Sequence, residues 1–376
     1  MRTDRGCKKR KKQKTQTNRC GEAIRSAHRL RALARREHFK HRLDEATLIS
    51  SVLQEPGSPR HTIAGNPAPA FEKRPCAQFS GSVLARFLEL RGRHIIKACG
   101  ALWYTVPGRF LMSLPYQAML NPDPDEVRGL IRETGTFGAR FPSLSWTGLQ
   151  SGLYILRQRN YDIGSLHVKH RPRVRRALEC FEVRPAKRAE LLDQGWSLNL
   201  STMARQGRYD PEFGDRRRWE RLVEAAFACQ GIAFPAVFSG PRMTAYMATC
   251  REENWLHILH QMSRQEDLPN FPNHLLTYAV TREAAVDPSL EVVCYGYVPL
   301  FAAEGLHEYK LRFGYEMIPH CSAIQLHPAL DLVLNRSAAR AGVRLARRLR
   351  HGNQHLETLE TVLEGARLSG PPHTPC

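Results

Sequence analysis

The sequence lacks closely spaced cysteines. Ten cysteines are spread over 376 residues, and no two of them are separated by only two residues. This spacing argues against a zinc ribbon and against a disulfide scaffold, and cysteines inside apolar runs act as small hydrophobic residues. We therefore expect a reduced, cytoplasmic protein without a metal site.

Long apolar runs and the short motifs of several enzyme classes are also missing. No apolar stretch approaches the roughly 18 to 20 residues that span a bilayer, and the basic N-terminus has no apolar core of a signal peptide. A nucleophile elbow, a P-loop, a zinc-protease helix and a dinucleotide-binding fingerprint are absent too. Hydrolase, kinase and dehydrogenase activities therefore have little support, and we expect no transmembrane segment.

Positive charge is abundant and unevenly spread. The net charge is +20, and residues 1–45 hold 16 Lys and Arg against 5 Asp and Glu. A run such as Lys8–Lys14 has too little apolar content to offset its ordering entropy, which predicts a disordered tail. Such a tail could attract nucleic acid or anionic lipid through their phosphates. A spurious upstream start codon would give the same appearance.

Strand and helix patterns alternate between residues 96 and 170, where we expect a first, incomplete lobe. The segments 101–105 and 109–113 flank a Pro-Gly pair, which predicts two strands joined by a tight turn. Asp123 as N-cap, followed by Pro124, predicts a helix of about three turns that ends before Gly135. Residues 1–95 are expected to hold the basic tail, a linker and a docking helix at 83–91.

A second lobe is expected over residues 171–330. It begins with a basic helix, and a short helix after it is expected to stop at Gly195. A polar loop at 196–209 would then carry Arg205 and Arg208. Helical spacing of apolar residues at 216–230 predicts an amphipathic helix that buries them, Phe227 included. The strands of this lobe are expected in the segments 233–238, 242–249, 254–264 and 291–297.

The stretch from Asn254 to Pro319 carries most of the functional information. Alternation in Trp255–Arg264 would put Leu256, Ile258, His260 and Met262 on one face of a central strand, and Trp255, His257, Leu259 and Gln261 on the other. A helix then begins near Pro272, with Asn270 or Asn273 as its cap. Its exposed N–H groups would suit a phosphate or pyrophosphate. The alternative is an ordinary connection between strand and helix.

A short helix near residue 310 follows the strand at 291–297. Leu306, Tyr309 and Phe313 mark its expected buried stripe, and Gly314 ends it. Lys310 lies beside this stripe. Its ammonium either extends to solvent or meets a donor phosphate or a developing oxyanion.

The order of "RMTAYMAT", "MSRQEDLPNFPNHLL", "VVCYG" and "LHEYKLRFGYEMIP" resembles the GNAT-fold acyltransferases, most of all the FemAB-like branch with its Fem peptidyltransferases. In that family a helix of the form L-x-x-(F/Y)-K-x-x-(F/W)-G follows the strand beyond the donor cleft. The residues that match it are Leu306, Tyr309, Lys310, Phe313 and Gly314. The resemblance covers Ala101–Pro328. It implies an α/β (α+β) fold with a GNAT-like mixed central sheet flanked by helices, in one lobe or two.

The resemblance further implies an N-acyltransferase that binds no cofactor permanently. The alternating glycines of the usual coenzyme A loop are absent from "SRQEDLPNFPN", which leaves both acyl-CoA and aminoacyl-tRNA as donors for an amine acceptor. The expected donor-binding residues are Ser263, Arg264, Asn270, Asn273 and Lys310, and the expected catalytic residues are Lys310, Tyr295, Tyr297 and His257. His260 and Glu308 are further candidate bases, and Arg205 and Arg208 could bind an acidic acceptor or donor.

The main alternative is a noncatalytic protein that binds RNA, DNA or an anionic membrane surface. Residues 331–376 are expected to form a basic helix and tail. In this helix Arg336, Arg340, Arg344 and Arg348 recur at four-residue spacing and make a positive stripe. Together with the basic tail, this stripe favours the polyanion-binding alternative.

Overall fold

The computed structural model describes residues 82–106, 108–207, 209–298, 304–334, 336–349 and 354–371. All of them belong to one compact unit of the chain, Thr47–Cys376. The predicted basic tail at 1–45, the linker before the docking helix, and Arg208 lie outside the described residues.

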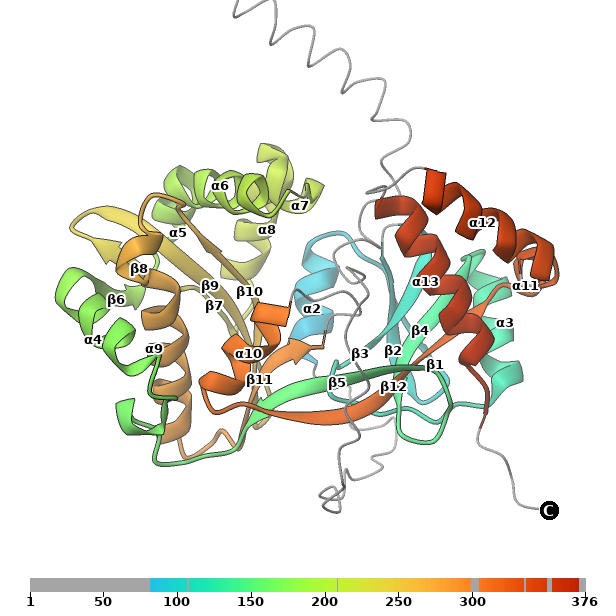
Figure 1. Ribbon diagram of the computed structural model, residues 1–376, viewed down its shortest axis with the longest axis horizontal. Coiled ribbons are helices and arrows are strands. Elements are labelled where there is room, and N and C mark those ends of the chain that lie inside the picture. The colour runs from blue at the N-terminus through green and yellow to red at the C-terminus, as the bar shows by residue number, and fades with distance from the viewer. Residues whose placement is uncertain are drawn as a thin grey trace, which may run out of the picture. The chain divides into compact units, whose positions relative to one another are not determined.

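Twelve strands of the described chain form one mixed sheet (Figure 1). Its order is β1-β2-β3-β4-β12-β5-β11-β10-β9-β8-β6, and β7 pairs with β9 beside this path. The pairs β3–β4 and β10–β11 are parallel, whereas the other neighbours are antiparallel. The strands are β1 (Ile95–Ala98), β2 (Ala101–Val106), β3 (Phe110–Leu114), β4 (Gly138–Ser143), β5 (Leu149–Leu156), β6 (Glu182–Pro185), β7 (Ile232–Ala233), β8 (Pro235–Ser239), β9 (Arg242–Glu252), β10 (Trp255–Ser263), β11 (Val292–Tyr297) and β12 (Glu316–Leu326).

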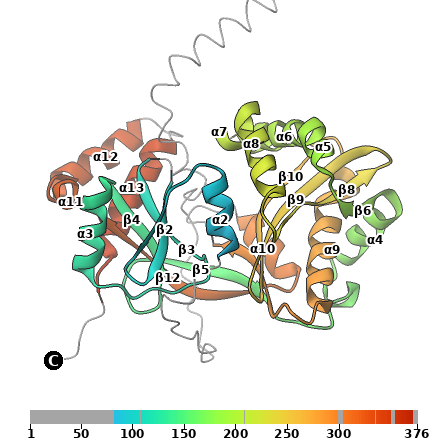
Figure 2. The ribbon, with the colours of Figure 1, turned by 180° about the vertical axis from the view of Figure 1, so that it is seen from behind.

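Helices lie on both faces of this sheet (Figure 2). They are α2 (Val83–Leu90), α3 (Pro124–Thr134), α4 (Arg171–Cys180), α5 (Arg188–Glu190), α6 (Trp196–Gln206), α7 (Pro211–Gly214), α8 (Arg216–Phe227), α9 (Pro272–Val286), α10 (Glu304–Arg312), α11 (Pro328–Leu334), α12 (Ser337–Leu349) and α13 (Gln354–Leu368). Two 3₁₀ turns, η3 (Ile163–Ser165) and η5 (Leu268–Asn270), and one π-helical turn, η4 (Leu191–Gly195), complete the set. The predicted fold class, a mixed sheet flanked by helices, is confirmed.

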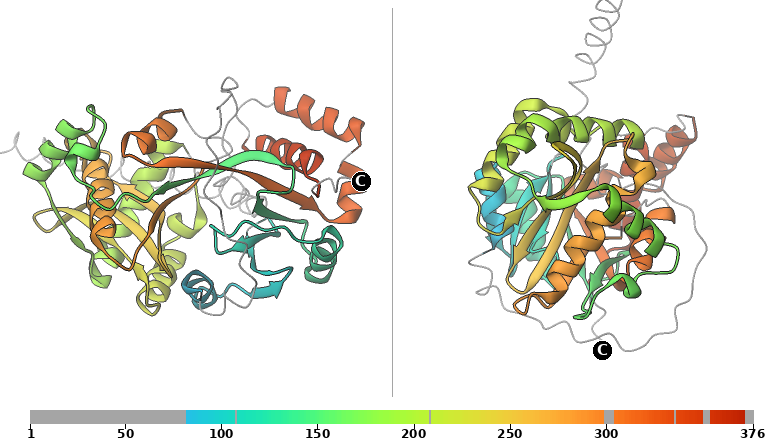
Figure 3. Two further views of the ribbon diagram at one scale, coloured as in Figure 1. Left: turned by 90° about the horizontal axis from the view of Figure 1, so that it is seen from below. Right: turned by 90° about the vertical axis from the view of Figure 1, so that its left-hand side faces the viewer.

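Strands β5 and β12 run side by side through the middle of the sheet (Figure 3). β12 also pairs with β4, and β5 also pairs with β11. The strands predicted for the two lobes therefore join in one continuous sheet.

Two apolar cores enclose strands β8 to β10. On one face, Leu275 and Leu276 of α9 pack with Ile258 and Met247. On the other, Trp219 of α8 packs with residues of α2, α6 and β9. Burial of a large apolar side chain stabilises a fold by about 2 kcal/mol, so these helices fix the position of β10.

Strands β2 to β4 and β12 are covered in the same way. Asp123 caps α3 by accepting from the Asp125 and Glu126 amides, and Gly135 ends the helix in the left-handed region with a φ of 59°, both as predicted. Buried residues of α3 pack on Trp103 and Phe141. Helix α13 covers the other face of β12, within the region expected to hold a basic helix and tail.

Most predicted elements are present, but the prediction around Gly195 is wrong. Gly195 has helical angles, and the expected loop after it is helix α6, which ends at Gly207. A Cβ at Gly195 would lie 2.7 Å from Cζ2 of Trp219, so this glycine permits close packing of α8 against the helix. The amphipathic helix is α8, but Phe227, expected to be buried, is 47% exposed.

In the described part of the chain, no helix combines the length and the apolar character needed to cross a membrane. No group of three or more His, Cys, Asp or Glu side chains in that part could hold a metal ion.

Candidate active site

Strands β10 and β11 are neighbours in the sheet for only three residue pairs. These pairs are Trp255↔Val292, Leu256↔Val293 and His257↔Cys294. Beyond them β10 continues along β9 as far as Ser263, while β11 pairs with β5 at Tyr297. The two parallel strands therefore separate after His257 and Cys294, and the sheet is open between them.

A β-bulge in β10 coincides with this separation. The pairing of β10 with β9 shifts register between Ile258 and His260, which leaves Leu259 as an extra residue. A bulge bends its strand and changes the face on which the following side chains lie. His260 and Met262 therefore share the face of His257 rather than that of Ile258, so the strict alternation predicted from the sequence is wrong.

A cleft of about 960 Å³ opens at this place. It is lined by residues of α2, β2 to β4, β10, β11, α7, α9 and α10. Its described lining contains five cationic side chains, Arg91, Arg140, Arg173, Arg205 and Lys310, and two carboxylates, Asp210 and Glu212. Glu212 already forms ion pairs with three arginines, among them Arg93 at 3.1 Å. The remaining cleft therefore carries an excess of positive charge.

Lys310 points into the protein and not to solvent. Its side chain is 5% exposed, and its Nζ donates to the carbonyl of Tyr295 at 2.6 Å. The ammonium lies 4.2 Å from the ring centre of Tyr154 and 4.9 Å from that of Tyr295. Burial lowers the pKa of Lys310 to about 7. Cation–π contacts and one carbonyl therefore replace the water that an exposed lysine would have.

The buried stripe of α10 differs from the predicted one. Phe313, just after the helix, is buried as expected, and Tyr309 is partly buried. Leu306 is 41% exposed and lines the cleft, so its assignment to the buried stripe is wrong. Leu306 stands in the first turn of the helix, where the cleft lies beside it, and Lys310 takes the buried position instead.

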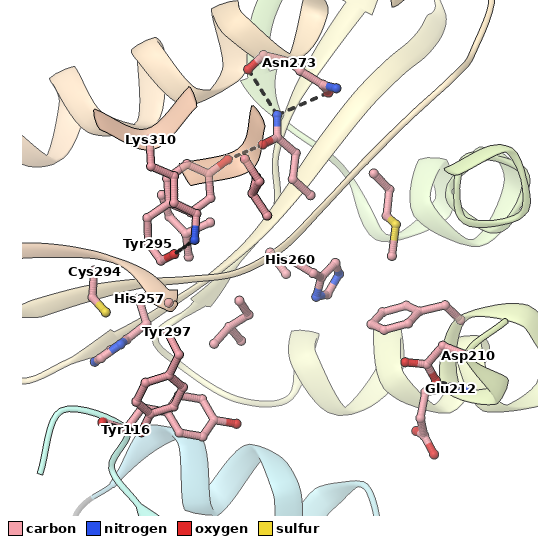
Figure 4. A pocket seen from close by; sticks show the side chains of 18 of the residues that line it. Tyr116, Asp210, Glu212, His257, His260, Asn273, Cys294, Tyr295, Tyr297 and Lys310 are labelled. Atoms are coloured by element: carbon pink, nitrogen blue, oxygen red, sulfur yellow. Dashed lines mark hydrogen bonds between the residues drawn. The ribbon is translucent and has the colours of Figure 1, made fainter. Parts of the chain in front are cut away.

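A network of uncharged polar groups joins the elements around the cleft (Figure 4). The Tyr295 hydroxyl donates to Oε1 of Gln261 at 2.6 Å. Nε2 of Gln261 donates to the carbonyl of Asn273 at 3.1 Å, and the Tyr309 hydroxyl donates to the same carbonyl at 3.0 Å. Since a satisfied buried network holds its members in one arrangement, it fixes α9 and α10 against the separated strands. Burial also raises the pKa of Tyr295 to about 12.

Helix α9 begins at the cleft without a side-chain cap. Pro272 occupies the first turn, as predicted, but the N-cap residue is Phe271, which has a φ of 61° and makes no capping hydrogen bond. The expected caps are wrong, because Asn270 accepts from Arg176 and Asn273 donates its side-chain amide to Ser263. Both Phe271 and Asn273 line the cleft. The Phe271 amide donates to the carbonyl of Leu268, and the His274 amide donates to that of Phe271. Because proline has no N–H, only the Asn273 amide at the start of α9 is left without a partner among the described residues.

The other predicted donor-binding residues have different positions. Ser263 is buried, and its Oγ accepts from Asn273 at 3.1 Å and from Arg205 at 3.2 Å, so it connects α9, α6 and β10. Arg264 donates to the carbonyl of Met243 at 2.9 Å and is absent from the described cleft lining. Arg205 does line the cleft, and burial lowers its pKa.

His257 lines the cleft at the point where the strands separate (Figure 4). It is 3% exposed, and its Nε2 has no hydrogen-bond partner among the described residues. Burial lowers its pKa to about 4, so the ring is neutral at pH 7. The ring stacks on Trp255 and meets the edge of Tyr116.

The remaining candidates divide into two groups. Tyr297 and His260 line the cleft. The Tyr297 hydroxyl donates to the carbonyl of Tyr116 at 2.6 Å, and burial raises its pKa. Glu308 forms an ion pair with Arg312 on the exposed side of α10 and is not part of the described cleft lining.

Sequence reasoning did not identify several residues of the site. Arg140 and Arg173 line the cleft, Tyr154 contacts the Lys310 ammonium, and Gln261 connects Tyr295 with Asn273. Strand alternation could have suggested Tyr154. The bulge that redirects Gln261 has no sequence signal of its own.

The arginine stripe of α12 is partly neutralised within the fold. Arg344 lies 3.6 Å from Glu360 of α13, and Arg347 lies 2.9 Å from the same residue. At least one member of the predicted stripe therefore faces a carboxylate of its own chain.

No family model matches the sequence, and no curated protein matches it. Solved structures do match. FemX is 12% identical, with a TM-score of 0.47 over 67% of this chain and 93% of its own. L-PGS from Bacillus licheniformis is 13% identical, with a TM-score of 0.46 over 73% and 96%. A GCN5-related N-acetyltransferase from Kribbella flavida is 10% identical, with a TM-score of 0.39 over 65% and 94%.

At these identities and TM-scores the matches carry no conclusion about the activity of this chain. The chemistry of the cleft therefore has to follow from its own side chains.

Proposed function

We propose that the protein is an N-acyltransferase that moves an acyl or aminoacyl group from an activated donor to an amine. The separation of β10 from β11 after three residue pairs is the observation that supports this proposal best. Beyond His257 no described strand pairs with the β11-facing edge of β10. Free backbone groups on such an edge can bind an extended ligand as an additional strand.

The phosphates of the donor would bind at the start of α9. The start of α9 offers the free Asn273 amide and the partial positive charge of a helix N-terminus, which suit a phosphate group. Arg173 and Arg205 also line the cleft and add positive charge. Acyl-CoA and aminoacyl-tRNA both carry phosphates, so this arrangement accommodates either donor class.

The transfer forms one C–N bond and breaks the C–S or C–O bond of the donor. The amine attacks the donor carbonyl, the carbonyl oxygen becomes negative, and the thiolate or ribose oxygen then leaves. The Lys310 ammonium would stabilise the negative oxygen, and a low-dielectric site strengthens this effect. His257 would accept the proton that the amine loses, and Tyr295 or Tyr297 would donate one to the leaving group. Holding both reactants in contact supplies much of the remaining rate enhancement.

A donor screen tests this proposal. The purified protein is mixed with acetyl-CoA, longer acyl-CoAs or charged tRNA, and binding is measured by thermal shift. At least one donor should stabilise the protein, and Lys310→Met should lose part of that stabilisation, because the ammonium would contact the carbonyl oxygen of the bound donor. The matched control Lys97→Met, at an exposed lysine of β1, should keep it. If no donor class stabilises the wild-type protein, the transferase proposal is wrong.

A further inference from the structure

Strand β4 brings to the cleft a guanidinium that has no counter-ion among the described residues. Arg140 of β4 lines the cleft, and its Nε donates to Oγ of Ser322 at 2.7 Å. Across the residues that the structure describes, no carboxylate forms an ion pair with Arg140, and its Nη groups make no hydrogen bond. A guanidinium has five N–H donors in a fixed fork, so four of them remain for a ligand.

The surroundings of Arg140 do not compensate its charge. Burial lowers the pKa of Arg140 to about 10, and only the hydroxyls of Tyr297 and Tyr104 act in the opposite direction. Arg140 is half-buried, and a cation that is partly removed from water without an anion is unfavourable. A bound anion would remove this penalty. Arg184 differs from Arg140 in this respect, because both of its Nη groups donate to the carboxylate of Glu190.

A row of aromatic groups leads from Arg140 to the point where β10 and β11 separate. Tyr297 neighbours Arg140 and donates to the carbonyl of Tyr116. The ring of Tyr116 lies 5.9 Å from that of Tyr297 and 6.4 Å from that of His257. Figure 4 shows His257, Tyr297 and Tyr116 gathered on the same side of β11, away from Lys310. Two aromatic contacts therefore connect His257 with the tyrosine that neighbours Arg140, and Nε2 of His257 has no partner in the described part of the chain.

We infer that Arg140 binds an anionic group of the acceptor, a carboxylate or a phosphate, while the amino group of the acceptor lies at His257. This inference rests on the proposed transferase function and names its acceptor class: a molecule that carries both an amine and an anion. The guanidinium fork matches the two oxygens of either group, whereas a neutral amide or alcohol offers no charge. Arg140 thereby marks an acceptor subsite that is distinct from the donor subsite at Lys310 and α9.

The test uses two pairs of probes that differ only in the anion. Isothermal titration compares alanyl-alanine with alanyl-alanine amide, and phosphoethanolamine with ethanolamine, on the full-length protein. The anionic member of at least one pair should bind about tenfold more tightly, the effect of one charge-assisted hydrogen bond. Arg140→Gln should remove this preference without changing the affinity for the neutral member. Arg140→Lys should keep part of it, and Arg132→Gln, at an exposed arginine of α3, should keep all of it.

The two probe pairs distinguish the two anions, because the pair with the larger preference identifies the group that Arg140 binds. Equal binding within both pairs would overturn the inference, as would a preference that survives in Arg140→Gln. Thermal unfolding of each variant shows whether it is folded, and Arg140→Lys provides the measurement if Arg140→Gln is not. Donor binding is measured separately. If a donor binds but neither probe pair shows an anion preference, the transferase proposal is kept and the inference about Arg140 is rejected. If the preference depends on Arg140 but no donor binds, the anion site is kept and the transferase proposal is rejected.

Discussion

Replacing Lys310 by methionine should stabilise the fold at neutral and acidic pH while it weakens donor binding. Burial lowers the pKa of Lys310 from 10.5 to about 7. A tenfold change in an acid dissociation constant corresponds to about 1.4 kcal/mol, so the charged amine lowers the free energy of unfolding by on the order of 5 kcal/mol. Methionine has a similar length and no charge, so it can fill the space between the rings of Tyr154 and Tyr295.

The pH dependence of this effect has a definite sign. Above pH 10.5 the amine is neutral in both the folded and the unfolded chain, so the penalty is absent. Between pH 10.5 and about 7 the unfolded chain holds the proton and the folded chain does not, so stability falls as the pH falls. Below about pH 7 both states are charged, and the full penalty remains.

Urea unfolding at pH 6 and at pH 10 measures this difference. The gap in unfolding free energy between Lys310→Met and the wild-type protein should be several kcal/mol at pH 6 and much smaller at pH 10. Lys97→Met, at an exposed lysine, should show no such change with pH. An equal or lower stability of Lys310→Met at pH 6 would refute the reasoning, because it would mean that the ammonium is well solvated.

Three further predictions follow from particular residues. If charged Lys310 stabilises the oxyanion, kcat/KM for the donor should fall as the pH rises through about 7, the pKa of this amine. Lys310→Arg should abolish that fall, because arginine keeps its charge. A pH profile that is unchanged in Lys310→Arg would exclude this role. Gly195→Ala should destabilise the protein by about 1 to 3 kcal/mol, because the new Cβ would lie 2.7 Å from the Trp219 ring. Gly129→Ala, which has open space around it in α3, should instead stabilise the protein by up to about 1 kcal/mol. Denaturant midpoints of the two variants measure this difference, and equal effects would contradict the packing argument. Deletion of residues 1–45 should weaken binding to a nonspecific oligonucleotide by at least about tenfold while donor binding persists, since a protein that loses several phosphate contacts loses affinity steeply. Filter binding measures this affinity, and an unchanged value would place polyanion binding in the folded part.

Local patterns predicted much of the fold. Asp123 and Gly135 set the limits of α3, and a turn at Gly240 and Pro241 joins β8 to β9, because cap and turn residues act through their own backbone. The prediction at Gly195 was wrong because a glycine can either end a helix or permit close packing. Gly195 permits close packing, and this depends on Trp219, which is distant in sequence. The division into two lobes stays a prediction.

The candidate site was predictable only in part. Lys310, Tyr295 and His257 meet at the cleft, since each stands on an element that the sequence pattern placed correctly. The caps of α9 and the faces of β10 were not predictable, because they depend on the bulge at Leu259 and on tertiary partners. Arg140 stands on a strand far from Lys310 in sequence, so only the paired sheet shows that both line one cleft.

Hydrogen exchange with and without the donor tests the central claim most directly. The donor that stabilises the protein in the thermal screen is added to the full-length protein, and amide protection is mapped along the chain. The account predicts new protection in β10 after the bulge, at residues 260–262, and at the Asn273 amide at the start of α9, because the Ser263 amide already donates to Thr202. Protection confined to α12, with these two segments unchanged, would contradict the claim that the open sheet between β10 and β11 binds the donor.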